Sequence, residues 1–252
     1  MPLPGGPSDK LGNRYELWWT VSQLIRIIDG QAASIRIEDP NVDKAEFVIT
    51  VGDQRELHQA KRSHTDGKWS LSSLGKDGLL QAMFDQLSED SKTRFVFVSG
   101  SDAPELRELA ERAMRAKNLE EFDSVFVSAE TQKKALNTLK GFWRNADTAT
   151  AYEVLQRIEV RTIDERGLEE QIRESLKMRF PNKPNDVCDA LRSIVEDSIP
   201  HGTIDRESLI PDLRGKGCPL RKHIRPEDAP SLISDVTTHS PKHTQHLSLI
   251  HI

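Results

Sequence analysis

The sequence predicts an α/β fold with a central mixed β-sheet flanked by helices, followed by a helical segment. An amphipathic helix at residues 15–28 precedes three short β-type segments that lie close together between residues 33 and 62. Two more β-type segments, 94–99 and 158–162, are separated by stretches of helical periodicity. Strands that alternate with helices are typical of this fold class.

The first part of the chain contains a helix and a β-hairpin. Apolar residues recur at three- and four-residue spacing from Tyr15 to Ile28, and Asp29-Gly30 ends this helix. Residues 52–55 are a short polar link, which indicates a hairpin turn between two of the strands that follow. These predicted strands cover residues 33–38, 46–51 and 56–62.

The later part alternates helices with two strands. Residues 94–99 are unbroken β-formers, which is typical of a buried strand. Residues 122–127 are compatible with either a short strand or a loop, and the region after about residue 165 is predicted to be all-helical. The predicted helices cover residues 76–87, 104–117, 131–143, 147–157, 165–180, 185–198 and 205–213.

Composition limits the classes of protein. Charged residues make up 30% of the 252 residues and the net charge is −5, so any nucleic-acid surface would be local. No apolar run is long enough for a membrane span, and the first residues lack the pattern of a signal peptide. The two isolated cysteines suggest a reducing cytoplasm. Residues 237–252 lack periodicity, and we expect a non-native or disordered tail there.

The predicted hairpin carries polar residues that suit a metal-dependent phosphodiesterase site. Side chains alternate along a strand, so Gln59 and Lys61 share one face, and a turn near Asp53-Gln54 would place Glu46 roughly opposite Lys61. A carboxylate and an amide oxygen can bind Mg²⁺, with Mn²⁺ as the alternative, and a lysine can position the attacking water. The alternative is an exposed hairpin with a Glu46–Lys61 ion pair.

Other residues are candidates for the same site. Asp43 precedes the strand and is a rival or additional metal ligand and catalytic residue. Glu16 and Glu38 are weaker candidates for a second shell of ligands or a second metal. Basic residues beside the hairpin could hold DNA phosphates: Arg62, His64 and Lys68.

Several motifs, in order, resemble a known family. Gly12-Asn-Arg-Tyr-Glu-Leu-Trp-Trp19, Glu46-Phe-Val48 and His58-Gln-Ala-Lys61 resemble the nuclease domain at the N-terminus of bacterial antiphage effectors, both CD-NTase-associated and STAND-type. This domain is a branch of the PD-(D/E)xK superfamily, and the resemblance therefore implies a restriction-endonuclease-like core. The usual Asp and (Asp/Glu)-x-Lys are represented here by Glu46 or Asp43 and by Gln59-x-Lys61.

The resemblance implies a Mg²⁺-dependent endonuclease that cleaves double-stranded DNA in antiviral defence. It implies a nuclease domain at residues 10–163 and a helical linker at 164–236 that leads to a missing C-terminal sensor. It also implies a homo-oligomer when activated, with no membrane partner. In this interpretation Glu46, Asp43 and Gln59 bind the metal. The alternative function is a catalytically inactive adaptor domain that binds DNA or protein, which the acidity of the chain and Gln59 favour.

Overall fold

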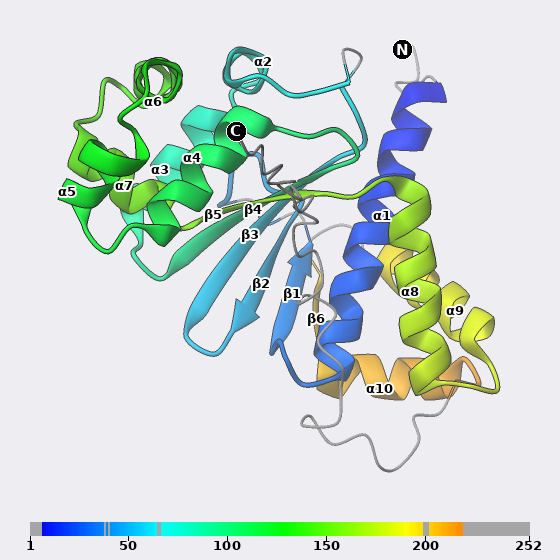
Figure 1. The fold of residues 1–252 in the computed structure, drawn as a ribbon. Helices are drawn as coiled ribbons and strands as arrows, with labels where there is room; N and C mark the ends of the chain where they lie inside the picture. Colours follow the sequence, from blue (N-terminus) through cyan, green and yellow to red (C-terminus); the bar gives the residue numbers. More distant parts are fainter. Residues whose placement is uncertain (1–6, 38, 40, 65–66, 199–201, 219–252) are drawn as a thin grey trace, which may run out of the picture.

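A six-stranded mixed sheet lies between two groups of helices in this computed structural model (Figure 1). The structure describes residues 7–37, 39, 41–64, 67–198 and 202–218. The strand order is β5-β4-β3-β2-β1-β6. The predicted α/β class, with a mixed sheet flanked by helices, is confirmed.

The sheet changes direction at β3. On one side the pairing is antiparallel, and it runs through β6 (Thr203–Asp205), β1 (Ser34–Ile37), β2 (Phe47–Val51) and β3 (Gln54–Lys61). On the other side the pairing is parallel, through β4 (Thr93–Ser99) and β5 (Ile158–Thr162). The hairpin between β2 and β3 turns at Gly52, whose φ of 60° suits a residue without a Cβ. β3 is therefore central and is hydrogen-bonded on both sides.

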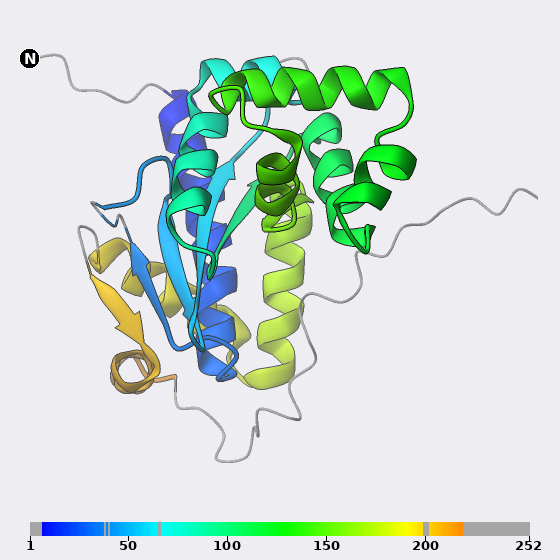
Figure 2. The same ribbon diagram turned by 90° about the vertical axis from the view of Figure 1, so that its left-hand side faces the viewer.

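Four helices cover one face of the sheet. They are α1 (Pro7–Ile28), α8 (Glu165–Arg179), α9 (Pro184–Asp197) and α10 (Arg206–Gly215), and α1 and α8 lie side by side in Figure 1. Their buried side chains form one core with the strands, and Val96 and Val98 contribute to it from β4. Figure 2 shows α10 and β6 together at the β1 edge of the sheet.

The other face carries the remaining helices and a second core. These helices are α2 (Leu71–Lys76), α3 (Leu79–Glu89), α4 (Pro104–Arg115), α5 (Leu119–Glu121), α6 (Glu130–Phe142) and α7 (Thr148–Leu155). Leu57, Phe95 and Phe97 contribute from the strands. Because neighbouring residues of β4 belong to different cores, the unbroken apolar run is explained by a strand that is buried on both faces.

Local differences from the predicted elements have physical reasons. Residues 122–126 form a π-helical turn, η1 (Phe122–Phe126), which is neither a strand nor a loop. The helix predicted at 76–87 corresponds to α3, which begins only after Gly78 with its φ of 77°, and residues 71–76 form the separate helix α2. The region after residue 165 is not all-helical, because β6 pairs with β1 in antiparallel register. A segment of three residues is too short to show a period in the sequence.

Residues beyond 163 share the core with the first helix. The side chain of Arg179 in α8 donates from Nε to Oδ1 of Asp29 at 2.7 Å, and its second contact joins Nη2 to Oδ2. The two side chains are 3% and 0% exposed. The segment expected as a linker is thus held to the end of α1 by a buried ion pair, in addition to apolar packing.

No helix in the described ranges is long and apolar enough to cross a membrane. Cys188 and Cys218 are both buried and free. The expected tail at 237–252 lies outside the described residues, as does Glu38.

Candidate functional site

Strands β2 and β3 bring together polar residues at one end of the sheet. Phe47 pairs with His58, and the backbone N of Glu46 donates to the carbonyl O of His58 at 2.8 Å. Glu46 therefore lies opposite Gln59, two positions away from the Lys61 pairing that the sequence suggested. Four residues make up what we call the acid–lysine cluster: Glu16, Glu46, Gln59 and Lys61.

The contacts inside the acid–lysine cluster are polar. Nε2 of Gln59 donates a hydrogen bond to Oε1 of Glu46. The pKa of Glu16, in α1, is raised to about 7. Burial is the largest cause and the nearby carboxylate of Glu46 is the next, while Lys61 acts in the opposite direction. Two acids from different elements thus face one region, with Lys61 close enough to act on the same group.

Lys61 is oriented by partners from outside the hairpin. Its Nζ lies 2.6 Å from Oδ2 of Asp77 and 5.8 Å from the centroid of the Trp69 ring. Trp69 in turn donates from Nε1 to Oγ of Ser99, at the end of β4, at 2.8 Å. The expected alternative, a Glu46–Lys61 ion pair, does not form within the described part of the chain.

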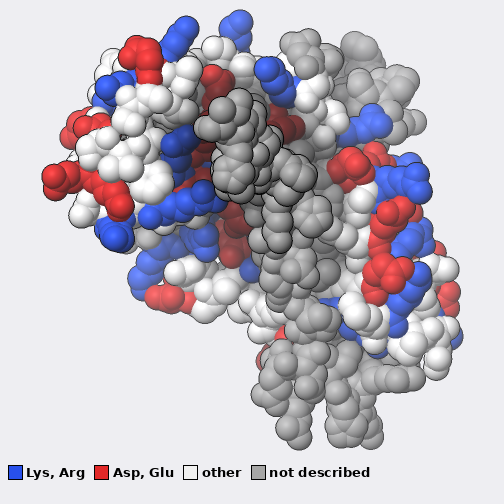
Figure 3. Space-filling model, in the orientation of Figure 1, with Lys and Arg blue, Asp and Glu red and all other residues white. Residues whose placement is uncertain are grey.

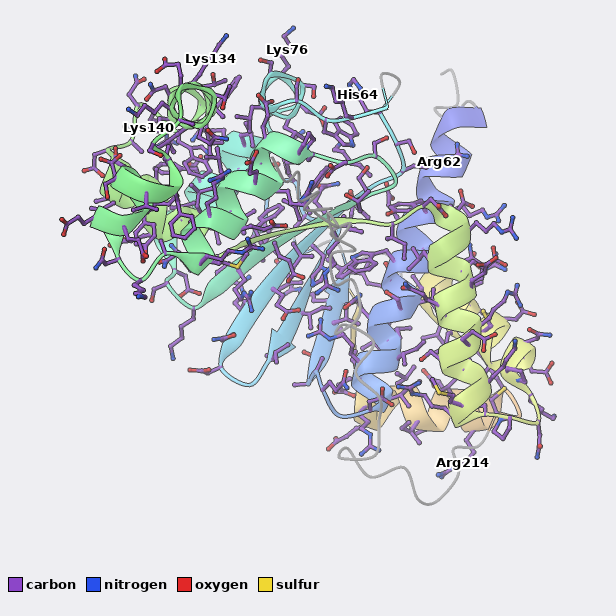
Figure 4. All side chains as sticks on the ribbon, in the orientation of Figure 1. Arg62, His64, Lys76, Lys134, Lys140 and Arg214 are labelled. Carbon is purple, nitrogen blue, oxygen red and sulfur yellow. The ribbon has the colours of Figure 1, made fainter. Side chains whose placement is uncertain are left out.

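The remaining predicted site residues lie around the cluster or apart from it. Asp43 is exposed in the turn before β2, and no recorded contact among the described residues joins it to the cluster. Arg62 and His64 follow β3 at the upper end of the sheet, as Figure 4 shows. Nε of Arg62 lies 3.3 Å from Glu165, and the ring of His64 packs against Trp69. Lys68 is exposed, and its backbone forms an isolated β-bridge with Asp102.

The opposite face of β3 holds a buried polar network that the sequence analysis missed. We define it by Trp19, Arg26, Glu56 and His58. Nε1 of Trp19 donates to Nδ1 of His58 at 3.1 Å, and Nε2 of His58 lies 3.3 Å from Oε2 of Glu56. Nη1 of Arg26 donates to the same Oε2 at 2.7 Å. Strict alternation along Glu56–Lys61 was the available signal, since it assigns Glu56 and His58 to the face opposite Gln59 and Lys61.

The network fixes the protonation of its members. Trp19 can only donate, so Nδ1 of His58 accepts and Nε2 carries the proton that is shared with Glu56. Burial lowers the pKa of His58 to about 4, although Glu56 acts in the opposite direction. Although burial alone would raise the pKa of Glu56, its hydrogen bonds with His58 and Arg26 hold the pKa well below its usual range. At neutral pH the network is a neutral imidazole beside a buried Arg–Glu pair.

The acid–lysine cluster has donors that fit a hard cation. Glu46 contributes to the raised pKa of Glu16, after burial, and Gln59 offers an amide oxygen if its side-chain amide is rotated by 180°. No group of three or more His, Cys, Asp or Glu residues with metal-binding geometry occurs within the described ranges. Two carboxylates with waters and a ligand phosphate are nevertheless the usual environment of Mg²⁺.

A glycine holds the end of β3 close to the end of β4. The backbone N of Gly100 donates to the carbonyl O of Arg62 at 2.7 Å, and a Cβ at Gly100 would lie 2.3 Å from that oxygen. Gly100→Ala should therefore push Arg62 and Lys61 away and lower the free energy of unfolding by about 1–3 kcal/mol. Chemical denaturation measures this loss. Gly141→Ala is the matched control, since its Cβ meets nothing within 4 Å, and an equal loss there would contradict the explanation.

Comparisons with known proteins identify similar folds. No family model matches the sequence, and no curated protein matches it. The Acinetobacter baumannii Cap4 SAVED/CARF-domain containing receptor with the cyclic trinucleotide 3'3'3'-cAAA matches with a TM-score of 0.53 and 14% identity, over 85% of this chain and 46% of that chain. The same receptor with 2'3'3'-cAAA gives a TM-score of 0.52 and 13% identity, over 86% and 46%. The Moraxella osloensis Cap4 SAVED/CARF-domain containing receptor gives 0.51 and 14%, over 82% and 47%.

These similarities establish a shared fold, and this chain spans about half the length of the solved structures it matches. They also correct the functional expectation. The matched proteins are described as receptors, two of them with a cyclic trinucleotide, and none is described as a nuclease. The expectation of a metal-dependent endonuclease for double-stranded DNA, and with it the description of the chain as a nuclease, was wrong on this comparison.

Proposed function

We propose that this chain is one part of a receptor for cyclic oligonucleotides. The observation that carries the proposal is the fold it shares, over 85% of its length, with a receptor solved with a cyclic trinucleotide. The acid–lysine cluster supports the same conclusion, because its residues suit the phosphodiester groups that such a ligand contains. Because the chain spans less than half of that receptor, the function of the complete receptor is part of the proposal.

Charge decides how a phosphodiester would be held at this place. Glu16 and Glu46 alone would repel an anion, whereas a Mg²⁺ ion between them would attract it. Lys61 adds a positive charge on the same face of β3 as Gln59. Within the proposal, Glu16 and Glu46 hold the ion, Gln59 adds an oxygen ligand, and Lys61 contacts the phosphate directly.

Isothermal titration of 3'3'3'-cAAA into the protein tests the proposal. We expect binding in Mg²⁺ that falls by about tenfold or more in EDTA, in Glu46→Gln and in Lys61→Ala, because a charge-assisted contact is lost each time. The matched control is Lys92→Ala. Lys92 also forms an ion pair, at 2.8 Å to Asp53, but it lies at the opposite end of β3 and β4.

Three results would contradict the proposal. One is the absence of binding by the unaltered protein. Another is binding that Lys92→Ala weakens as much as Lys61→Ala does. The third comes from a parallel sample with linear double-stranded DNA in place of the trinucleotide: cleavage that needs Mg²⁺ and is lost in Glu46→Gln would show that the receptor proposal is wrong. Chromatography of the titrated trinucleotide shows whether the ring stays intact.

A further inference from the structure

A cleft of about 740 Å³ lies beside β5, the strand at one edge of the sheet. It is bordered by α1, α8 and α4, and Figure 1 shows β5 passing between α4 and α8. The volume is in the range of pockets that hold small-molecule ligands. Its lining combines arginines with apolar, neutral polar and three acidic side chains, and we call it the arginine cleft. The arginines are Arg26, Arg94, Arg107 and Arg161.

Two of these arginines are already neutralised. Nε of Arg161 lies 2.6 Å from Glu159, and its guanidinium lies over the Trp19 ring at 5.7 Å. Arg107 pairs with Asp102 at 3.0 Å and with Glu111 at 3.3 Å. These pairs stiffen the walls of the cleft, but they leave little charge for a ligand.

The other two arginines have donor groups without a partner among the described residues, although Arg26 is already paired with Glu56. Arg94 is half-buried in β4, and its guanidinium forms no ion pair or hydrogen bond with the described residues. Glu56, which is paired with Arg94 on the adjacent strand β3, already has its carboxylate in contact with Arg26 and His58. Arg26 is only 8% exposed, and its Nε has no hydrogen-bond partner in the described part of the chain. A buried guanidinium nitrogen without a partner costs free energy, so an acceptor at this place would be stabilising.

Surface arginines elsewhere behave differently. Figure 3 shows acidic and basic side chains interspersed over α8, where Arg166 pairs with Glu170 and Arg173 with Glu169, each four residues away. Such pairs are ordinary for an exposed helix. Arg94 points into a cleft and lacks this compensation, which makes it the strongest candidate for binding an anion.

We propose that the arginine cleft binds a nucleoside phosphate, with Arg94 and Arg26 on the phosphate. Arginine presents a planar fork of donors that matches phosphate oxygens. The apolar part of the lining, contributed by Ile163, Leu168 and Ile172 among others, offers a surface for the base. Gln23 and Gln171 provide neutral hydrogen-bonding groups for the sugar and base. This site is independent of the acid–lysine cluster and of the function proposed for it.

Titration of AMP in EDTA tests the site, because without divalent ions the acid–lysine cluster does not attract an anion. Binding is followed by calorimetry and by tryptophan fluorescence, since Trp19 lines the cleft. We expect Arg94→Gln to weaken AMP binding by about tenfold or more. Gln171→Glu, an exposed residue on another wall, should also weaken it by adding a negative charge. Both variants keep the core unchanged.

Arg144→Gln is the matched control. Arg144 is exposed and pairs with Asp85 on the other face of the sheet, so AMP affinity should stay within about twofold. Inorganic phosphate should bind more weakly than AMP and lose its binding in Arg94→Gln. The proposal is overturned if AMP does not bind the unaltered protein, or if Arg94→Gln and Arg144→Gln have equal effects.

Discussion

Arg179→Met should lower the free energy of unfolding by about 3–5 kcal/mol, the largest loss that we expect from one substitution. The side chain of Asp29 is completely buried and its ion-pair partner is Arg179. Without the guanidinium, a carboxylate would remain in the core with no opposite charge. Urea denaturation followed by circular dichroism measures the change.

Two further variants make this prediction specific. Arg166→Met removes an exposed ion pair from the same helix, and we expect no measurable loss. The double variant Asp29→Leu, Arg179→Met should recover much of the lost stability, because neither charge remains buried. A single variant Arg179→Met as stable as Arg166→Met would show that the pair does not hold α8 to α1.

The stability contributed by His58 should disappear as the pH falls from about 6.5 to about 4, by roughly 3 kcal/mol in total. The pKa of this buried imidazole is lowered from 6.5 to about 4 in the folded protein. Between about pH 6.5 and 4, His58 is therefore protonated in the unfolded chain but not in the folded chain, and protonation favours unfolding. Glu56, whose pKa is held low by His58 and Arg26, adds to this loss only at pH values below its usual pKa of 4.5.

Glu16 acts in the opposite direction over part of the same range. Its pKa is raised to about 7, so between about pH 7 and 4.5 the folded chain takes up a proton before the unfolded chain does, and acidification is stabilising. The measurement must therefore be a difference. The difference in unfolding free energy between the unaltered protein and His58→Asn should shrink as pH falls from 7 to 4. The same shrinkage is expected when both proteins also carry Glu16→Gln. A gap that is constant with pH would contradict the buried neutral imidazole.

The order of helices and strands could be predicted because each has its own local signal. The hairpin, the buried run at 94–99 and the presence of helix α1 all follow from the pattern of apolar residues, although α1 is buried on nearly all sides instead of amphipathic. β6 could not be predicted, since its three residues become a strand only by pairing with β1. The ion pair between Asp29 and Arg179 joins residues 150 positions apart, and a contact at that distance cannot be predicted from a local sequence pattern.

The candidate site was predicted in part. Gln59 and Glu46 are in contact, and Glu16 in α1 lies close enough to Glu46 and Lys61 for both to affect its pKa. Asp43 forms no contact with these residues in the described part of the chain, because it is exposed in the turn before β2. The Lys61–Asp77 pair depends on how α2 and α3 fold back over β3, which is a property of the tertiary structure. The arginine cleft draws its lining from β4, β5 and three helices, so its residues are scattered along the sequence.

Strand β3 gives the molecule a shared backbone with two chemically distinct sides. Gln59 and Lys61 face one proposed ligand region, while Glu56 and His58 support Arg26 and Trp19 in the wall of the other proposed region. Any occupant that shifts this strand therefore changes the geometry presented on its reverse side. Thermodynamic linkage makes such an effect mutual: the factor by which AMP alters cation affinity on one side must equal the factor by which the cation alters AMP affinity on the other.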